Sequence, residues 1–149
     1  MSRNGTLQSS PMRPLGTQLT VELYECTSEQ FDDLDWIKEV LVQAAICARA
    51  TVVDALFHKF SPIGISGVVV IAESHLAIHT WPEHRYAAVD IFTCGEVLDG
   101  NAAISHIAAH FQSAHYTVKR IQRGLIALDS LFNEAIAQNS QSRERQKIA

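Results

Sequence analysis

The sequence has little of what marks several large classes of protein. Lys and Arg number only 12 against 16 Asp and Glu, which gives a net charge of −4. Because phosphate backbones are bound by clustered cations, we expect no nucleic-acid partner. No stretch approaches the roughly 20 apolar residues of a membrane helix, and the N-terminal segment lacks the hydrophobic centre of a secretion signal. We therefore expect no membrane partner and a cytoplasmic location.

Cysteine is also scarce. The three thiols, Cys26, Cys47 and Cys94, are widely spaced and odd in number, which argues against a disulfide framework. No Cys-x-x-Cys pair is present, so a structural zinc site is not expected. At least one of these thiols is therefore a candidate for chemistry rather than for structure.

Two groups of side chains resemble metal ligands without matching a known metal motif. A zinc site made of His75, His79 and Cys94 matches no standard ligand spacing. His106 and His110 are four residues apart, which places two ligands on one helix face, but this spacing is more typical of a solvated face. We therefore predict no metal.

Short apolar segments separated by polar breaks make up most of the chain. Alternation of Leu19, Val21 and Leu23 with polar residues is typical of a half-buried strand. By the same criteria, strands are predicted over 17–25, 51–58, 67–72, 75–80, 86–92 and 116–122, the last as a possible edge strand. Apolar residues at helical spacing predict helices over 34–48 and 101–114, and a short one is possible over 125–137.

Adjacent strands joined by short turns, with helices occurring singly, favour an antiparallel sheet with helices on one face. The predicted fold class is a two-layer α+β sandwich. The uncovered sheet face predicts a dimer in which two sheets stack as a four-layer αββα assembly. With 149 residues, we expect a flexible N-terminal arm (1–15), one domain (16–137) and a disordered tail (138–149).

The densest polar chemistry lies at Glu73-Ser74, where two predicted strands meet in a tight turn. A serine in a strained turn can attack the carbonyl before it, which converts the peptide to an ester. Elimination then leaves an N-terminal pyruvoyl group. His75 and His79 share one strand face and can move protons near neutral pH. Each residue also has an ordinary reading: a turn serine that bonds its own backbone, or a half-buried histidine.

Three further residues have both a chemical and an ordinary reading. Cys94 ends a predicted strand, where its thiol could donate a proton or simply fill space as a small hydrophobe. Phe60 could stack on a flat ligand or belong to the core. Glu83 could bind sugar hydroxyls or be a solvated loop charge.

Taken together, these segments resemble one family. Glu-Ser-His-Leu-x-Ile-His-Thr-Trp-Pro-Glu, followed by Tyr-Ala-Ala-Val-Asp-Ile-Phe-Thr-Cys-Gly, is similar to the short bacterial and archaeal S-adenosylmethionine decarboxylases. The resemblance extends to Leu23-Tyr24-Glu25-Cys26, to the segment 57–70 and to Arg123-Gly124. It covers roughly residues 16 to 125.

The resemblance implies a self-processing enzyme. The proenzyme would cleave itself between Glu73 and Ser74 into a β chain, 1–73, and an α chain, 74–149. Ser74 would become a covalently bound pyruvoyl group, the only cofactor, which forms a Schiff base with the amine of S-adenosyl-L-methionine. The decarboxylated product is an aminopropyl donor for spermidine biosynthesis. The implied assembly is an (αβ)2 homodimer of processed protomers.

The resemblance also assigns roles to individual side chains. His79 matches the proton acceptor of processing, and Ser66 matches a residue that assists it. Cys94 matches the proton donor to the product carbon. Phe60 matches an aromatic side chain that stacks on adenine, and Glu83 matches the carboxylate that binds the ribose hydroxyls.

Departures from the family pattern leave alternatives open. His84 and Arg85 stand where the family commonly has Tyr-Gly, and Gln18 stands where it often has His. Arg disfavours backbone angles that Gly accepts, and a cation there could repel a sulfonium or attract a carboxylate. One alternative is therefore a self-processing relative that decarboxylates L-ornithine or L-arginine. Another is a non-catalytic homologue that binds a ligand or partner without processing.

Overall fold

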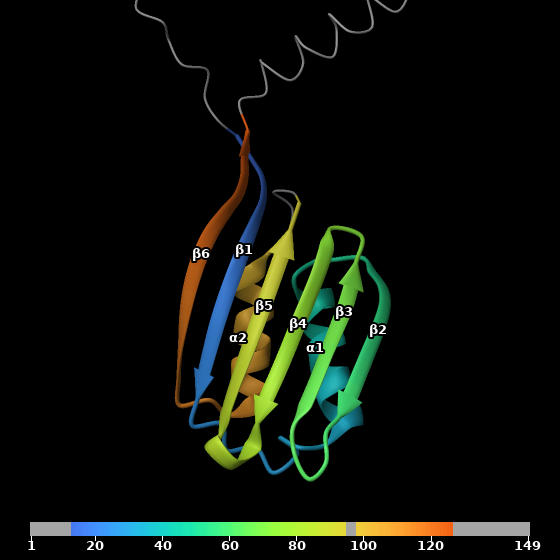
Figure 1. Ribbon diagram of the computed structural model, residues 1–149, viewed down its shortest axis with the longest axis vertical. Coiled ribbons are helices and arrows are strands. Elements are labelled where there is room, and N and C mark those ends of the chain that lie inside the picture. Colours follow the sequence, from blue (N-terminus) through green and yellow to red (C-terminus); the bar gives the residue numbers. More distant parts are fainter. Residues whose placement is uncertain (1–12, 95–97, 127–149) are drawn as a thin grey trace, which may run out of the picture. The chain divides into compact units, whose positions relative to one another are not determined.

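One antiparallel sheet organises the molecule. The computed structural model describes residues 13–94 and 98–126. Its strands lie in the order β2-β3-β4-β5-β1-β6, so β2 and β6 are the edge strands (Figure 1). The elements are β1 (Arg13–Tyr24), α1 (Leu34–Cys47), β2 (Val52–Lys59), β3 (Ile65–Ile71), β4 (Ser74–Trp81), the 3-10 turn η1 (Pro82–His84), β5 (Tyr86–Thr93), α2 (Gly100–Phe111) and β6 (His115–Ile126).

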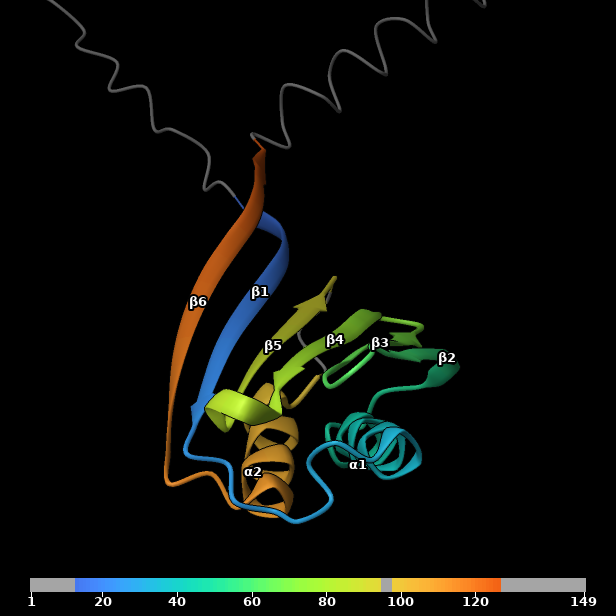
Figure 2. The ribbon, with the colours of Figure 1, turned by 60° about the horizontal axis from the view of Figure 1, so that its bottom comes forward.

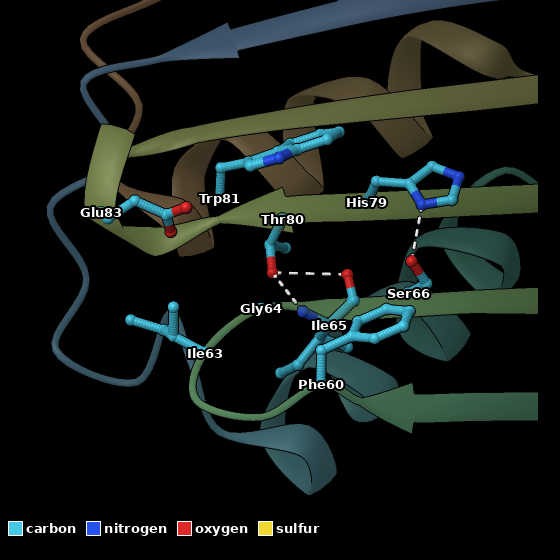
Figure 3. A pocket seen from close by; sticks show the side chains of 9 residues that line it. All are labelled: Phe60, Ile63, Gly64, Ile65, Ser66, His79, Thr80, Trp81 and Glu83. Atoms are coloured by element: carbon cyan, nitrogen blue, oxygen red, sulfur yellow. Dashed lines mark hydrogen bonds between the residues drawn. The ribbon is translucent and has the colours of Figure 1, made fainter.

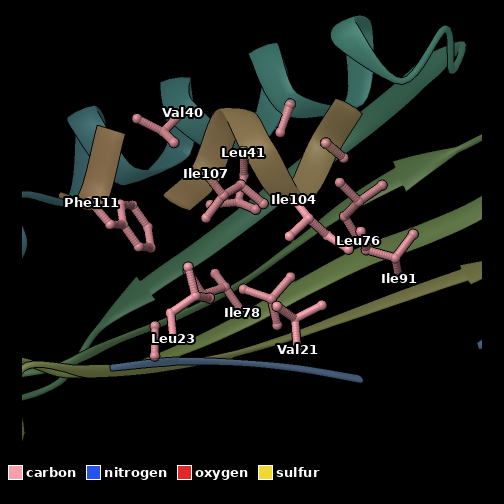
Figure 4. Close-up of a cluster of buried hydrophobic side chains, with 14 of the residues drawn as sticks. Val21, Leu23, Val40, Leu41, Leu76, Ile78, Ile91, Ile104, Ile107 and Phe111 are labelled. Atoms are coloured by element: carbon pink, nitrogen blue, oxygen red, sulfur yellow. The ribbon is translucent and has the colours of Figure 1, made fainter. Parts of the chain in front are cut away.

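Because successive side chains of a strand point to opposite faces of the sheet, every second residue enters the core. In β4, Leu76, Ile78 and Thr80 are buried, whereas the residues between them are not. Both helices lie on the same face of the sheet, which we call the inner face (Figure 2). Buried side chains of strands and helices meet between the two layers (Figure 4). The predicted α+β two-layer sandwich is confirmed, whereas the αββα dimer stays a prediction.

Each helix begins at an aspartate. Asp33 Oδ1 accepts the N–H of Trp36 at 2.8 Å at the start of α1. Asp99 Oδ1 accepts the N–H of Ala102 at 3.1 Å at the start of α2. These caps satisfy amides that have no partner within the helix and contribute about 1 kcal/mol each. Behind them, every Leu or Ile side chain buried against the sheet contributes about 2 kcal/mol.

Each predicted strand is present, but several ends differ. β1 begins at Arg13 rather than Thr17, and β6 extends beyond the predicted 116–122. α2 ends at Phe111 because Gln112 takes a left-handed conformation, with φ 50°, that closes the helix. Residues 125 and 126, predicted to start a helix, continue β6. The rest of that predicted helix, the predicted tail and positions 1–12 of the predicted arm lie outside the described residues.

The chain divides into two compact units. The larger unit comprises residues 16–123 and contains the core and every site residue discussed below. In the smaller unit, the described residues are the ends of β1 and β6. There Gly124 has φ 65°, and a Cβ atom on it would lie 3.0 Å from the Leu15 Cβ atom, so both facts favour glycine. No helix in the described ranges is long and apolar enough to cross a bilayer.

Candidate active site

The peptide bond between Glu73 and Ser74 lies at the end of a pinned turn. Ser74 begins β4 with φ 151°, a backbone angle that residues with a Cβ atom rarely adopt. The Thr51 N–H donates to Oε2 of Glu73 at 3.2 Å. The Ala72 N–H donates to the carbonyl oxygen of Thr51 at 2.9 Å. Two hydrogen bonds therefore tie this turn to Thr51.

Groups on both sides of this bond are placed to react. Ser74 is the cross-strand partner of Thr93, so Cys94 comes beside Glu73. The Cys94 N–H donates to the carbonyl oxygen of Glu73 at 2.9 Å. A donor in this position polarises the carbonyl and stabilises negative charge on its oxygen. The Ser74 hydroxyl oxygen lies 3.3 Å from Nδ1 of His75. We call Glu73, Ser74, His75 and Cys94 the cleavage cluster.

A second cluster surrounds a pocket near the other end of β4. Ser66 and His79 are cross-strand partners on β3 and β4, and Ser66 Oγ lies 2.6 Å from Nδ1 of His79. The pocket has a volume of about 330 Å³. Its lining comprises Phe60, Ile63, Gly64, Ile65, Ser66, His79, Thr80, Trp81 and Glu83 (Figure 3). Aromatic, carboxylate and imidazole groups are therefore available to a single ligand.

The turn between β2 and β3 forms one wall of this pocket and is held by Asp32. The Gly64 N–H donates to Asp32 Oδ1 at 3.0 Å. Lys59 Nζ lies 2.8 Å from Asp32 Oδ2 and also donates to the Asp32 carbonyl oxygen. Burial alone would raise the pKa of Asp32, but the hydrogen bonds from Lys59 and Gly64, with the Lys59 charge, lower it. This arrangement also keeps the Lys59 ammonium group bound to Asp32.

Arg85, one of the residues that depart from the family pattern, lines a cavity other than the pocket around Phe60 and Glu83. Arg85 takes the left-handed conformation, with φ 50°, which fits a position where glycine is common. It lines a cavity of about 420 Å³. The other lining residues are Cys26, Thr27, Ser28, Glu29, Phe31, Asp32 and Pro82. Burial raises the pKa of Cys26 to about 11, so its thiol stays protonated at neutral pH.

Gln18, which also departs from the family pattern, belongs to a polar network on the outer face of the sheet, opposite the helices. Gln18 Nε2 donates to Asp90 Oδ1 at 3.3 Å, and Arg123 Nη1 donates to Gln18 Oε1 at 2.5 Å. On the same face, the Tyr86 hydroxyl donates to Glu22 Oε2. Burial, with the hydrogen bond to Glu22 and its charge, raises the pKa of Tyr86 to about 12. Gln18 therefore joins neighbouring strands and does not line the pocket.

His106 and His110, both on α2, contact each other and lie outside both clusters. The rings of His106 and His110 lie 4.0 Å apart between centroids, and Cys47 Sγ lies 3.7 Å from His106 Nδ1. Burial, with the charge of His110, lowers the pKa of His106. Over the described parts of the chain, no group of three or more His, Cys, Asp or Glu could hold a metal ion.

The structure thus divides the residues selected from the sequence into two sets. Phe60, Ser66, His79 and Glu83 line the pocket. Glu73, Ser74, His75 and Cys94 form the cleavage cluster. His79 is five residues from Ser74 along the extended β4, a separation of about 16 Å. One chain therefore does not bring the two sets together.

Sequence reasoning missed two contributors to these clusters: Asp32 holds the turn beside Phe60, and Trp81 lines the pocket. His75, expected from the sequence to move protons, contacts the Ser74 hydroxyl. The position of Trp81 beside Pro82 in the recognised motif was an available signal. Nothing in the sequence distinguishes Asp32 from its acidic neighbours, because its role depends on the distant Gly64 and Lys59.

Comparison with known proteins finds relatives over most of the chain. A family model described as S-adenosylmethionine decarboxylase matches residues 17–124. A Pseudomonas aeruginosa protein named S-adenosylmethionine decarboxylase proenzyme is 55% identical over 119 residues, covering 80% of this chain and 74% of that protein. A Thermodesulfovibrio yellowstonii protein of the same name is 49% identical over 116 residues, covering 78% and 86%. The crystal structure of the adenosylmethionine decarboxylase from Aquifex aeolicus matches with a TM-score of 0.70 and 32% identity, over 76% of this chain and 94% of that one.

Proposed function

The chain belongs to the S-adenosylmethionine decarboxylase family and is an enzyme of that class, and from this premise we propose that it decarboxylates S-adenosyl-L-methionine with a pyruvoyl group made from its own Ser74. The product would be decarboxylated S-adenosylmethionine, an aminopropyl donor for spermidine biosynthesis. The observation that carries the proposal is the cleavage cluster. A serine with a strained φ of 151° follows a carbonyl that already accepts a hydrogen bond from Cys94.

Processing begins when Ser74 Oγ attacks the carbonyl carbon of Glu73. The Cys94 N–H, 2.9 Å from the carbonyl oxygen, stabilises the charge that develops there. Breaking the C–N bond leaves an ester, and elimination then releases Glu73 as a carboxylate. Addition of water and loss of ammonia complete the pyruvoyl group. In its bound form this group supplies an electrophilic carbonyl that draws electrons from the substrate as carbon dioxide leaves.

The remaining site residues act on protons or on substrate binding. His79 accepts a proton during processing, and Ser66, 2.6 Å from its Nδ1 atom, orients the ring. Cys94 donates a proton to the product carbon through its exposed thiol. In the pocket, Phe60 stacks on adenine and Glu83 accepts hydrogen bonds from the ribose hydroxyls. No metal takes part in this scheme.

The separation of the two clusters supports a homodimer whose site is shared between subunits. His79 lies about 16 Å along β4 from Ser74 in the same chain, too far for a proton transfer. A two-fold axis that runs between two stacked sheets and across their strands would place the Ser74 end of β4 against the pocket end of the partner's β4. Large apolar side chains are exposed on this sheet, including Leu56 at 74% and Trp81 at 40%. Their burial would stabilise the contact.

A mixing experiment tests the shared site. Full-length His79→Ala retains Ser74, and full-length Ser74→Ala retains His79, so neither is expected to cleave alone. When the two are folded together in equal amounts, about half of the His79→Ala chains should pair with Ser74→Ala and become cleaved. Mass spectrometry distinguishes the two chains. Absence of any cleavage in the mixture, while wild type cleaves, would show that each chain uses its own His79.

Released carbon dioxide tests the proposed reaction directly. Purified wild-type protein is incubated with carboxyl-labelled S-adenosyl-L-methionine, and intact mass reports cleavage in the same sample. We expect two fragments and labelled carbon dioxide from wild type, and neither from Ser74→Ala. A cleaved protein that releases no label would reject the substrate, and a chain that never splits would favour the non-catalytic alternative.

The alternative substrates, L-ornithine and L-arginine, were suggested by His84 and Arg85. Arg85 lines the cavity with Cys26 rather than the pocket with Phe60 and Glu83, which favours an adenosyl substrate. Product analysis with a panel of amino acids separates the two possibilities. Putrescine or agmatine in place of decarboxylated S-adenosylmethionine would support the alternative.

A further inference from the structure

We infer that His75 is the general base of the first processing step and acts on Ser74 of its own chain. The inference rests on the proposed self-cleavage between Glu73 and Ser74. Processing needs a base twice, and the inference assigns each of these two steps to a different histidine. His75 acts when the peptide becomes an ester, and His79 acts in the later elimination.

Distance separates the two roles. His75 Nδ1 lies 3.3 Å from the Ser74 hydroxyl oxygen, within reach of its proton. Among the hydrogen bonds of the described residues, this is the one that joins an imidazole to Ser74. His79 of the same chain lies about 16 Å along β4. For the hydroxyl to donate, Nδ1 of His75 must be unprotonated and the ring proton must be on Nε2.

The His75 ring is also held in place. Phe92, its cross-strand partner on β5, stacks on it with 5.9 Å between ring centroids and 28° between planes. The guanidinium carbon of Arg123 lies 6.0 Å from the centroid of the Phe92 ring. A nucleophile, a base within hydrogen-bond distance and a third group that orients the base form the usual arrangement for activating a serine.

The step is balanced without another reactant. His75 accepts the hydroxyl proton as Ser74 Oγ bonds to the carbonyl carbon of Glu73. The resulting negative charge lies on the carbonyl oxygen, which accepts the Cys94 N–H at 2.9 Å. When the C–N bond breaks, the electron pair goes to the nitrogen of Ser74 and His75 returns its proton there. The product is the Glu73 ester of Ser74 Oγ, and His75 is regenerated.

Hydroxylamine tests this assignment because it cleaves esters rapidly and amides slowly. The full-length chain is made by cell-free synthesis in a His79→Ala background, so that processing is expected to stop at the ester. Hydroxylamine should then split the chain and leave a hydroxamate on Glu73. Adding His75→Asn should slow this splitting by at least about tenfold, because the ester no longer forms at its normal rate. Equal rates with and without His75→Asn would overturn the role of His75.

Matched variants keep the result interpretable. His75→Gln is a second neutral replacement, and circular dichroism melting compares the folding of both with the parent. His115→Asn removes an imidazole that stacks on Tyr24 with 4.9 Å between centroids, outside the cleavage cluster, and should leave the splitting rate unchanged. If wild type never cleaves and His79→Ala resists hydroxylamine, self-processing itself fails. If wild type cleaves but His75→Asn forms ester at the parent rate, only the role of His75 fails.

Discussion

Ser74 differs from an ordinary turn serine in its immediate surroundings. Its φ of 151° lies where residues with a Cβ atom are strained by roughly 1–3 kcal/mol. The carbonyl before it is hydrogen-bonded to the Cys94 amide, and its hydroxyl reaches His75. In the proposed processing, the strain would raise the free energy of the intact peptide relative to the ester. The hydrogen bond to Cys94 would lower the barrier between them.

Cys94 contributes two groups that a substitution can separate. Its backbone N–H contacts the Glu73 carbonyl oxygen, whereas its thiol is exposed. Cys94→Ala keeps the N–H, so self-cleavage should proceed within about threefold of the wild-type rate. Decarboxylation should fall by about 100-fold or more, because the proposed proton donor is lost. Intact mass measures the first effect and labelled carbon dioxide the second. A variant that stays uncleaved would instead place the thiol in processing.

Asp32 gives the pocket a dependence on pH. Its pKa is lowered by Lys59 and the Gly64 amide, so the carboxylate stabilises the fold above the unfolded-state pKa of about 3.9. This contribution is lost as pH falls through the lower folded-state pKa. Asp32→Asn should therefore lower the free energy of unfolding by about 1 kcal/mol at neutral pH, and the variant should melt at a lower temperature than wild type. The difference should vanish in strong acid.

Thermal melts from neutral pH to strong acid measure the effect of Asp32, with and without Asp32→Asn in the uncleaved Ser74→Ala protein. Glu39→Gln on the exposed face of α1 is the control and should change the melting temperature little at any pH. In processed protein, Asp32→Asn should raise KM more than it lowers kcat, because it loosens the wall that carries Phe60. An equal melting difference at every pH would exclude the carboxylate charge as the cause.

At the scale of elements, the sequence predicted most of the fold because its signals are local. In β4, the buried Leu76, Ile78 and Thr80 alternate with residues that are not buried, and both helices begin at a capping aspartate. The site was less predictable, because it depends on contacts between distant parts of the chain. Cross-strand register brings Cys94 to Glu73, and a contact between two loops joins Asp32 to Gly64. The resemblance selected the reactive residues, but it could not show that they form two separate clusters.

The packing of α1 on the sheet gives an element-scale prediction. Leu41 is fully buried between the layers, so Leu41→Ala leaves a cavity and should lower the free energy of unfolding by about 3 kcal/mol. Ile46 on the same helix is 51% exposed, and Ile46→Ala should cost less than about 1 kcal/mol. Urea unfolding in a Ser74→Ala background measures both, because the chain then stays continuous. Similar losses would contradict the inward position of Leu41.

At the scale of the whole molecule, the outer face of the sheet is the proposed dimer surface. Ala77 lies on the outer face of β4, paired in register with Asp90 on β5 and Val68 on β3. Its side chain is half-buried and flanked by His75 and His79 on the same face. This position lies between the two clusters, where stacked sheets would approach most closely.

Ala77→Glu should therefore disrupt the dimer. A carboxylate buried between two sheets, opposite its own copy, costs several kcal/mol. We expect sedimentation to show a monomer and mass spectrometry to show little cleavage. Ala109→Glu, on the exposed side of α2, is the matched control and should leave both unchanged. A dimeric, cleaved Ala77→Glu protein would place the subunit contact elsewhere.

The pairing of β3 with β4 continues on both sides of the scissile bond, from Ser66 opposite His79 to Ile71 opposite Ser74. The proposed break of the Glu73–Ser74 peptide would therefore nick a hairpin without separating its arms. The proenzyme folds as one polymer, but a nicked molecule that is denatured must reunite two fragments by collision. Its renaturation should depend on concentration and slow on dilution. Once cleaved, the protein would therefore refold less readily after denaturation than the uncleaved chain does.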